Sequence, residues 1–168
     1  MRKRVLWIED AGLEDLAYLA SPLNVAGVYD LETTLSPSEA WRKIKEEKFD
    51  VVVVDIRIPP GDDKEWTDVY RKYNYDKISA RLGMILLYSL LKPADELALV
   101  KLKDIPPWVA ADKFAVLSIE PKYTLKKCLR DCRIKHYRQK SSSSSPNMLL
   151  ELVEEILQKK PVKKGGNR

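Results

Sequence analysis

Short, continuous apolar runs recur along the chain and predict the strands of a sheet. Three runs are clear, at residues 5–8, 51–54 and 114–117, and a weaker one lies within residues 27–34. Continuous runs, rather than alternating apolar and polar positions, are typical of parallel strands that helices cover on both faces. Residues 134–140 alternate in character and carry several charges, which favours a strand at the edge of this sheet.

Helical patterns occupy the segments between the apolar runs. Ser36, Pro37 and Glu39 supply an N-cap, a proline at the first helical position and a capping-box glutamate, and apolar residues then follow at helical spacing. Further helices are expected at about residues 13–19, 121–131 and 145–157. The alternation of strands and helices predicts one α/β domain with a five-stranded sheet over residues 1–158.

The stretch between the third and fourth apolar runs is too long for a single helix with its loops. Within an insertion at about residues 62–80, apolar and aromatic side chains recur at positions i, i+3, i+4 and i+7: Trp66, Val69, Tyr70 and Tyr73. This spacing predicts an inserted amphipathic helix.

Residues 81–91 form a second helical pattern that is apolar on nearly every face. Such a helix must be covered on its outer side, either by the inserted aromatic stripe or by a second subunit. We expect the inserted stripe, because sequential elements usually pack together. Residues 93–111, which include Pro106, Pro107 and Trp108, are expected to be irregular.

The charge of the chain is unevenly distributed. Its 168 residues, enough for one domain, include 30 Lys and Arg against 25 Asp and Glu, a formal net charge of +5. Residues 159–168 alone account for this excess, lack an apolar period and are expected to form a basic, disordered tail. Nucleic-acid binding is therefore disfavoured, because the rest of the chain is formally neutral.

Membrane, secreted and zinc-binding classes are also disfavoured. The longest apolar runs are much shorter than the roughly 20 residues of a membrane helix, and the basic start lacks a signal-peptide apolar region, so we expect a cytoplasmic protein. Cys128 and Cys132 are expected to be free, buried or half-buried thiols. With His136 they would make only three zinc ligands, and a fourth is missing.

Polar side chains terminate the predicted strands. Glu9 and Asp10 follow the first strand, Asp55 the third, Ser118 the fourth and Lys140 the fifth. Ligands of open α/β sheets bind beyond these strand ends. Two carboxylates 4 Å apart repel by about 4 kcal/mol at an effective dielectric of 20, so the acids must take up protons or hold a cation. Their hard oxygen atoms suit Mg²⁺.

Other chemistries at these strand ends fit less well. The acids that follow the first strand would repel the pyrophosphate of a dinucleotide, and no glycine-rich turn is present there. Phosphatases that use an aspartate nucleophile carry a second acid two residues later, where this chain has Arg57. His136, the only histidine, lies within the fifth strand segment and is not paired with a nucleophile.

The set of residues at the strand ends resembles the receiver domain of two-component response regulators. The matching features are the acid pair, Asp55 with Ile58, Pro59 and Gly61 after it, Ser118 and Lys140. Tyr137 also matches an aromatic position on the output face of receivers. The resemblance covers about residues 4–158 and implies a flavodoxin-like, doubly wound α/β fold with strand order 2-1-3-4-5.

The same resemblance implies a role for each residue of the set. Asp55 would accept the phosphoryl group, and Glu9 and Asp10 would hold Mg²⁺ with it. Lys140 would pair with the phosphate, and the hydroxyl of Ser118 would turn towards it and move the loop after the fourth strand.

Some positions depart from the usual receiver pattern. Ser141 follows Lys140 at a position where receivers carry proline, and Ile119 stands where they carry a small residue. Arg57 and Glu120 lie two residues beyond the acceptor and the switch serine. We expect them to form an ion pair across the mouth of the site that excludes attacking water and slows hydrolysis of the phosphoryl group.

These features predict a stand-alone receiver that is phosphorylated on Asp55 and signals by protein-protein interaction. It would not be an enzyme beyond self-phosphorylation and auto-dephosphorylation. Its expected partners are a sensor histidine kinase or a phosphotransfer protein, and a downstream protein target, with homodimerisation as a further option. The alternative is a pseudo-receiver that acts without phosphorylation, as an interaction scaffold that uses the insertion and the face around Tyr137.

Overall fold

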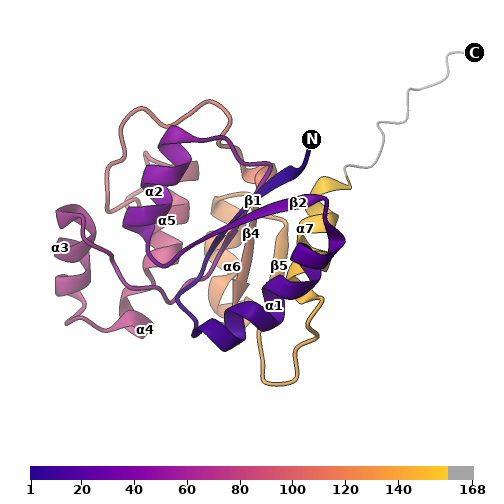
Figure 1. Ribbon diagram of the computed structural model, residues 1–168. Coiled ribbons are helices and arrows are strands. Elements are labelled where there is room, and N and C mark those ends of the chain that lie inside the picture. The colour runs from indigo at the N-terminus through magenta and orange to yellow at the C-terminus, as the bar shows by residue number, and fades with distance from the viewer. Residues whose placement is uncertain (159–168) are drawn as a thin grey trace, which may run out of the picture.

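The protein contains one five-stranded parallel sheet in a computed structural model, of which residues 1–158 are described (Figure 1). The strands are β1 (Lys3–Ile8), β2 (Tyr29–Thr34), β3 (Val51–Val54), β4 (Phe114–Ser118) and β5 (His136–Gln139). Their order is β2-β1-β3-β4-β5, as the resemblance implied, and β5 lies at an edge as expected. The expected basic tail, residues 159–168, lies outside the described residues.

Helices cover both faces of the sheet. Helices α1 (Leu13–Ala26) and α7 (Met148–Leu157) pack on one face, and α2 (Pro37–Glu46), α5 (Leu82–Leu91) and α6 (Lys122–Asp131) lie on the other (Figure 1). Because successive strand residues point to opposite faces, Trp7 packs with α1 and α7 while Ile8 packs with α2 and α5. This explains why the central strands are apolar at every position.

One helix end agrees with its sequence signal, and another lies beyond the predicted position. The hydroxyl of Ser36 accepts a hydrogen bond from the Glu39 N–H at 3.3 Å, which confirms the N-cap of α2. Helix α1 continues to Ala26 rather than ending near residue 19, although Pro22 lies inside it. Burial of Leu23 against the sheet outweighs the hydrogen bond that Pro22 removes.

The insertion forms two helices, α3 (Lys64–Lys72) and α4 (Lys77–Ala80), so the prediction of one helix was wrong. The chain turns between them, where Asn74 and Tyr75 have φ angles of 53° and 58°. The amphipathic pattern itself was correct, because Trp66 and Val69 of α3 are buried in the same core cluster as α5.

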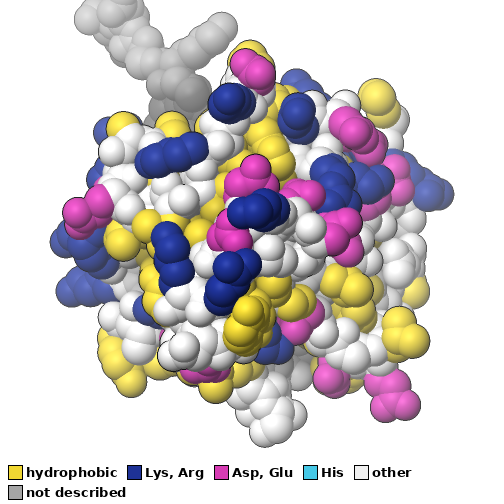
Figure 2. Space-filling model, turned by 90° about the vertical axis from the view of Figure 1, so that its left-hand side faces the viewer, with side chains coloured by type: hydrophobic (Ala, Val, Ile, Leu, Met, Phe, Trp, Pro, Cys, Tyr) yellow, Lys and Arg dark blue, Asp and Glu magenta, His cyan; other side chains and the backbone are white. Residues whose placement is uncertain are grey.

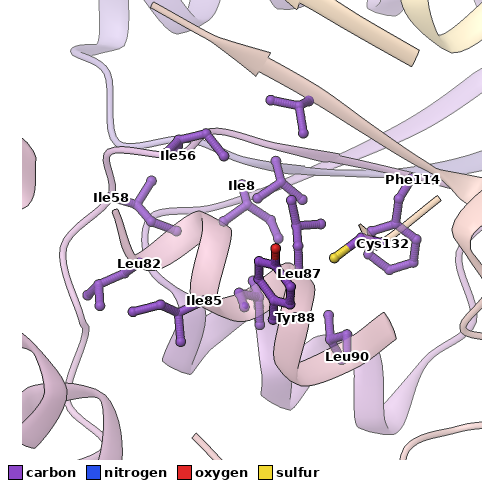
Figure 3. Close-up of a cluster of buried hydrophobic side chains, with 14 of the residues drawn as sticks. Ile8, Ile56, Ile58, Leu82, Ile85, Leu87, Tyr88, Leu90, Phe114 and Cys132 are labelled. Atoms are coloured by element: carbon purple, nitrogen blue, oxygen red, sulfur yellow. The ribbon is translucent and has the colours of Figure 1, made fainter. Parts of the chain in front are cut away.

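Helix α5 is covered within the chain, as expected. Eight of its ten residues are buried, and it packs beside α2 as well as against the side chains of α3. Figure 3 shows Ile8 of β1 and Phe114 of β4 close to Leu87 and Tyr88 of α5. The apolar surface of α5 therefore does not require a second subunit.

The remaining segments agree with their sequence patterns. Residues 93–110 are irregular and lead into a 3₁₀ turn, η1 (Ala111–Lys113), and Trp108 packs against Phe49 with 6.1 Å between ring centroids. Cys128 and Cys132 are free and buried. Within residues 1–158, every helix is too short or too polar to cross a membrane.

Candidate functional site

Three carboxylates meet at the carboxyl end of the sheet. Glu9 and Asp10 follow β1, Asp55 follows β3, and these two strands are neighbours in the sheet. One oxygen atom from each of the three side chains lies within 4.8 Å of the other two. Glu9 and Asp55 are only 2% and 4% exposed, and Asp10 is half-buried. The sequence therefore identified this cluster correctly.

Lys140, from the end of β5, contacts two of these acids. Its ammonium group donates a hydrogen bond to Glu9 and lies 3.5 Å from Oδ2 of Asp55. The backbone N–H of Lys140 donates to the Ser118 carbonyl at 2.9 Å, which places both residues at the same sheet edge. The peptide bond to Ser141 is trans, like every other peptide bond of the described chain.

The environment of the cluster disfavours the negative charge of Glu9. Burial raises the pKa of Glu9 to about 7, and the nearby Asp55 carboxylate acts in the same direction, while Lys140 opposes both. A bound cation would offset this cost. The donors are three carboxylates, one of them accessible to solvent, and this set of hard oxygen ligands with room for water fits Mg²⁺.

Ser118 is completely buried at the end of β4, where its hydroxyl accepts a hydrogen bond from the Glu120 N–H at 3.3 Å. The next residue, Ile119, is half exposed. It lines a cavity of about 400 Å³ together with Trp7, Glu9 and Lys140. Ile119, which stands where receivers carry a small residue, therefore lines the same cavity as Glu9 and Lys140.

The expected ion pair between Arg57 and Glu120 is present, with 2.9 Å between Nε and Oε1. Arg81 lies 3.3 Å from the other carboxylate oxygen, and the Thr124 hydroxyl donates to that oxygen at 3.0 Å. Burial opposes ionisation of Glu120, but hydrogen bonds from Arg57 and Thr124 hold its pKa below the ordinary value. The Tyr137 hydroxyl donates to the backbone carbonyl of Glu120, so Tyr137 is also tied to this loop.

Two residues at the site were not predicted. Lys77, in the inserted helix α4, places its ammonium 2.7 Å from Oδ2 of Asp10. Arg81, which separates α4 from α5, is the second cation on Glu120. Neither has a local sequence signal, because both positions depend on how the insertion folds back over the end of the sheet.

Comparison with known proteins was informative only at the level of structure. No protein-family model and no curated protein match the sequence. A response regulator receiver domain from Methanospirillum hungatei covers 94% of this chain and 94% of its own, with a TM-score of 0.56 and 17% identity. The chemotaxis response regulator CheY4 of Vibrio cholerae covers 93% of this chain and 99% of its own, with a TM-score of 0.58 and 16% identity.

A third similar structure contains a modified aspartate and a bound metal ion. It is a response regulator protein from Burkholderia pseudomallei with a phosphorylated aspartic acid, a calcium ion and citrate. It covers 92% of this chain and 64% of its own, with a TM-score of 0.51 and 22% identity. Together with the strand order and the acidic cluster at the sheet edge, these similarities show that the chain has the α/β fold of response-regulator receiver domains.

Proposed function

We propose that this protein acts as a receiver that accepts a phosphoryl group on Asp55. The observation that carries the proposal is the cluster of Glu9, Asp10 and Asp55 with Lys140 at the carboxyl end of the parallel sheet. This cluster combines oxygen ligands for a divalent cation, a carboxylate nucleophile and a cation for the transferred phosphate.

The reaction would be a phosphoryl transfer to a carboxylate oxygen. An oxygen atom of Asp55 forms a bond to phosphorus, while the bond from phosphorus to the donor's imidazole nitrogen or carboxylate oxygen breaks and the electron pair leaves with the donor. Mg²⁺, held by Glu9, Asp10 and Asp55, would neutralise charge on the phosphoryl group. Lys140, 3.5 Å from Asp55, is placed to pair with the phosphate.

Signal output would depend on the loop after β4. We propose that the Ser118 hydroxyl exchanges its Glu120 N–H donor for a phosphate oxygen and draws this loop inward. Tyr137, bonded to the Glu120 carbonyl, would follow the loop. The ion pair between Arg57 and Glu120 would restrict the approach of hydrolytic water and lengthen the life of the phosphorylated state.

The proposed function implies particular partners and a cellular location. A sensor histidine kinase or a phosphotransfer protein would supply the phosphoryl group, and a protein target would bind the altered surface. The protein would act in the cytoplasm as a receiver domain over residues 1–158, followed by the basic segment 159–168. Its only catalytic activities would be self-phosphorylation and auto-dephosphorylation.

The decisive experiment is intact-mass spectrometry after incubation with Mg²⁺ and acetyl phosphate. We expect a phosphate mass increment in the wild type that is absent in Asp55→Asn. Asp50→Asn is a matched control, because Asp50 precedes β3 and lies outside the acid cluster. It should be labelled like the wild type.

Failure of labelling would favour the scaffold alternative. If neither a small phosphodonor nor a cognate kinase labels the wild type, phosphorylation on Asp55 is excluded as the signal. Interaction through the insertion and the face around Tyr137, independent of phosphorylation, would then be the better assignment.

A further inference from the structure

The insertion places the positively charged side chain of Lys77 beside the proposed metal site. Lys77 of α4 forms an ion pair with Asp10, with 2.7 Å between Nζ and Oδ2. The side chains of Lys77 and Asp10 are 41% and 21% exposed, so the pair lies at the rim of the cluster. Since Lys140 bonds Glu9, each of the two acids after β1 is paired with its own lysine.

Several features hold α4 in the position that allows this contact. The Asp76 carboxylate caps the helix by accepting from the N–H groups of Ile78 and Ser79 at 3.0 and 3.3 Å. Ala80, at the other end, is buried in the core. The flanking residues Tyr75 and Arg81 have φ angles of 58° and 49°, a conformation that is unfavourable for side chains with a Cβ and is held by these contacts.

The charge balance of the cluster gives Lys77 a specific role. The three carboxylates can carry three negative charges, and Lys140 and Lys77 supply two positive ones. A divalent cation that binds Asp10 must either take the oxygen that Lys77 contacts or lie within a few ångströms of its ammonium group. Both arrangements are unfavourable because like charges repel at this range.

We propose that Lys77 is an internal counter-ion of Asp10 that competes with the divalent cation, so that cation binding and docking of α4 oppose one another. This inference rests on the metal site of the proposed function. Linkage requires the opposition to be reciprocal: if α4 weakens cation binding, the cation weakens the docking of α4 by the same factor.

Cation binding at the site would thus change the surface that the inserted segment exposes. Tyr75 and Ile78, beside Lys77, are 63% and 56% exposed. The face that carries α3 and α4 shows acidic and basic side chains next to one another, with apolar side chains between them (Figure 2). Release of Lys77 would therefore change both the charge and the apolar surface presented by α4.

The first test measures the dissociation constant of Mg²⁺ by isothermal titration calorimetry. Lys77→Met should bind Mg²⁺ about three- to tenfold more tightly than the wild type, a modest gain because the ion pair is partly exposed to solvent. Lys64→Met is the matched control, since Lys64 is a lysine of the same insertion that pairs with Asp68 on α3. It should bind like the wild type.

Equal or weaker Mg²⁺ binding by Lys77→Met would overturn the inference while leaving the metal site intact. A gain of the same size in Lys64→Met would also overturn it, because net charge alone would then be the cause. If neither the wild type nor Lys77→Met binds Mg²⁺, the metal site of the proposed function fails, and the inference with it.

The second test measures hydrogen exchange of residues 74–80 at constant ionic strength. We expect Mg²⁺ to accelerate exchange in the wild type and to have little effect in Lys77→Met, where α4 has already lost its contact with Asp10. Unchanged or slower exchange in Mg²⁺-saturated wild type would show that α4 docking and cation binding are not antagonistic.

Discussion

At the scale of single residues, Gly83 determines how closely α5 approaches the end of β3. A Cβ atom at this position would lie 1.8 Å from the backbone oxygen of Asp55, and the Gly83 N–H donates to the Ile56 carbonyl at 3.0 Å. Gly83→Ala must therefore displace α5 or the chain around Asp55. We expect a loss of about 1–3 kcal/mol in the free energy of unfolding, measured by urea denaturation.

Gly12 provides the control for that measurement. It precedes α1 with φ of −59°, and a Cβ there would have no heavy atom within 4 Å. Gly12→Ala should change the free energy of unfolding by less than about 0.5 kcal/mol. Similar losses in the two variants would mean that the close contact at Gly83 can relax without cost.

Arg57 is the residue that, in the proposed function, slows hydrolysis of the phosphoryl group through its ion pair with Glu120. Its side chain is 24% exposed and covers a Glu120 side chain that is only 6% exposed. Arg57→Ala should shorten the lifetime of phosphorylated Asp55 by about tenfold or less, because Arg81 remains on Glu120 and partly exposed pairs contribute modestly. The decay is measured after removal of the phosphodonor.

The comparison variant is Arg71→Ala, which removes an exposed arginine of α3 that pairs with Asp68. Its phosphoryl lifetime should equal that of the wild type. An unchanged lifetime in Arg57→Ala would show that the ion pair with Glu120 does not restrict water.

At the scale of secondary structure elements, α3 stabilises the core through Trp66. This side chain is 1% exposed and belongs to the same core cluster as the apolar side chains of α5. Trp66→Ala should lower the free energy of unfolding by about 3–5 kcal/mol. Tyr123→Ala, at an 80% exposed position of α6, should have little effect. Equal effects of the two variants would argue that α3 does not contribute to the core.

A hydrogen bond from Tyr88 to the Asp131 carboxylate joins α5 to α6, and the charge of this carboxylate depends on pH. Asp131 of α6 accepts hydrogen bonds from Lys127 at 2.7 Å and from the Tyr88 hydroxyl at 3.0 Å. The hydrogen bond from Lys127, with that from Tyr88, lowers the pKa of Asp131 to about 2 from an ordinary 3.8. Because the folded-state pKa is depressed, this stabilisation is present above about pH 4 and is lost as the pH falls towards 2.

We therefore expect wild type to exceed Asp131→Asn in stability at pH 6 and the difference to shrink at pH 3. Urea denaturation midpoints at the two pH values measure both quantities. A difference that is as large at pH 3 as at pH 6 would mean that the charge of Asp131 is not its cause.

The sequence predicted those elements whose local signals agree with their packing. The strands were recognisable because buried parallel strands are apolar at every position, and the strand-end acids because chain order places them at one edge. The break after α3 was missed because Asn74 and Tyr75 adopt positive φ without a glycine to signal it. Lys77 was missed for a related reason, since its contact with Asp10 depends on that turn.

At the scale of the whole molecule, charge and fold carry different information. The net charge of +5 gives no sign of the acidic cluster, because Glu9, Asp10 and Asp55 are few and mostly buried. The structural likeness to receivers, at 16–22% identity, extends over more than nine-tenths of the chain but establishes the fold alone. The proposed function therefore depends on whether this cluster binds a cation.

Binding of Mg²⁺ to the folded state would stabilise the whole domain. At a concentration about ten times the dissociation constant, a ligand that binds only the folded state contributes about 1.4 kcal/mol. For a domain of this size that corresponds to a rise of about 3–6 °C in Tm. We expect this rise in the wild type with MgCl₂, relative to NaCl of equal ionic strength, measured by differential scanning calorimetry.

Asp10→Asn should lose most of this rise, because it removes one of the three carboxylates that would hold the cation. Asp30→Asn, an exposed aspartate of β2, changes the net charge equally and should retain the full rise. If all three proteins responded alike, general screening by Mg²⁺ would account for the stabilisation. A rise confined to proteins with an intact Asp10 instead places the cation at the end of β1, beside the proposed phospho-acceptor.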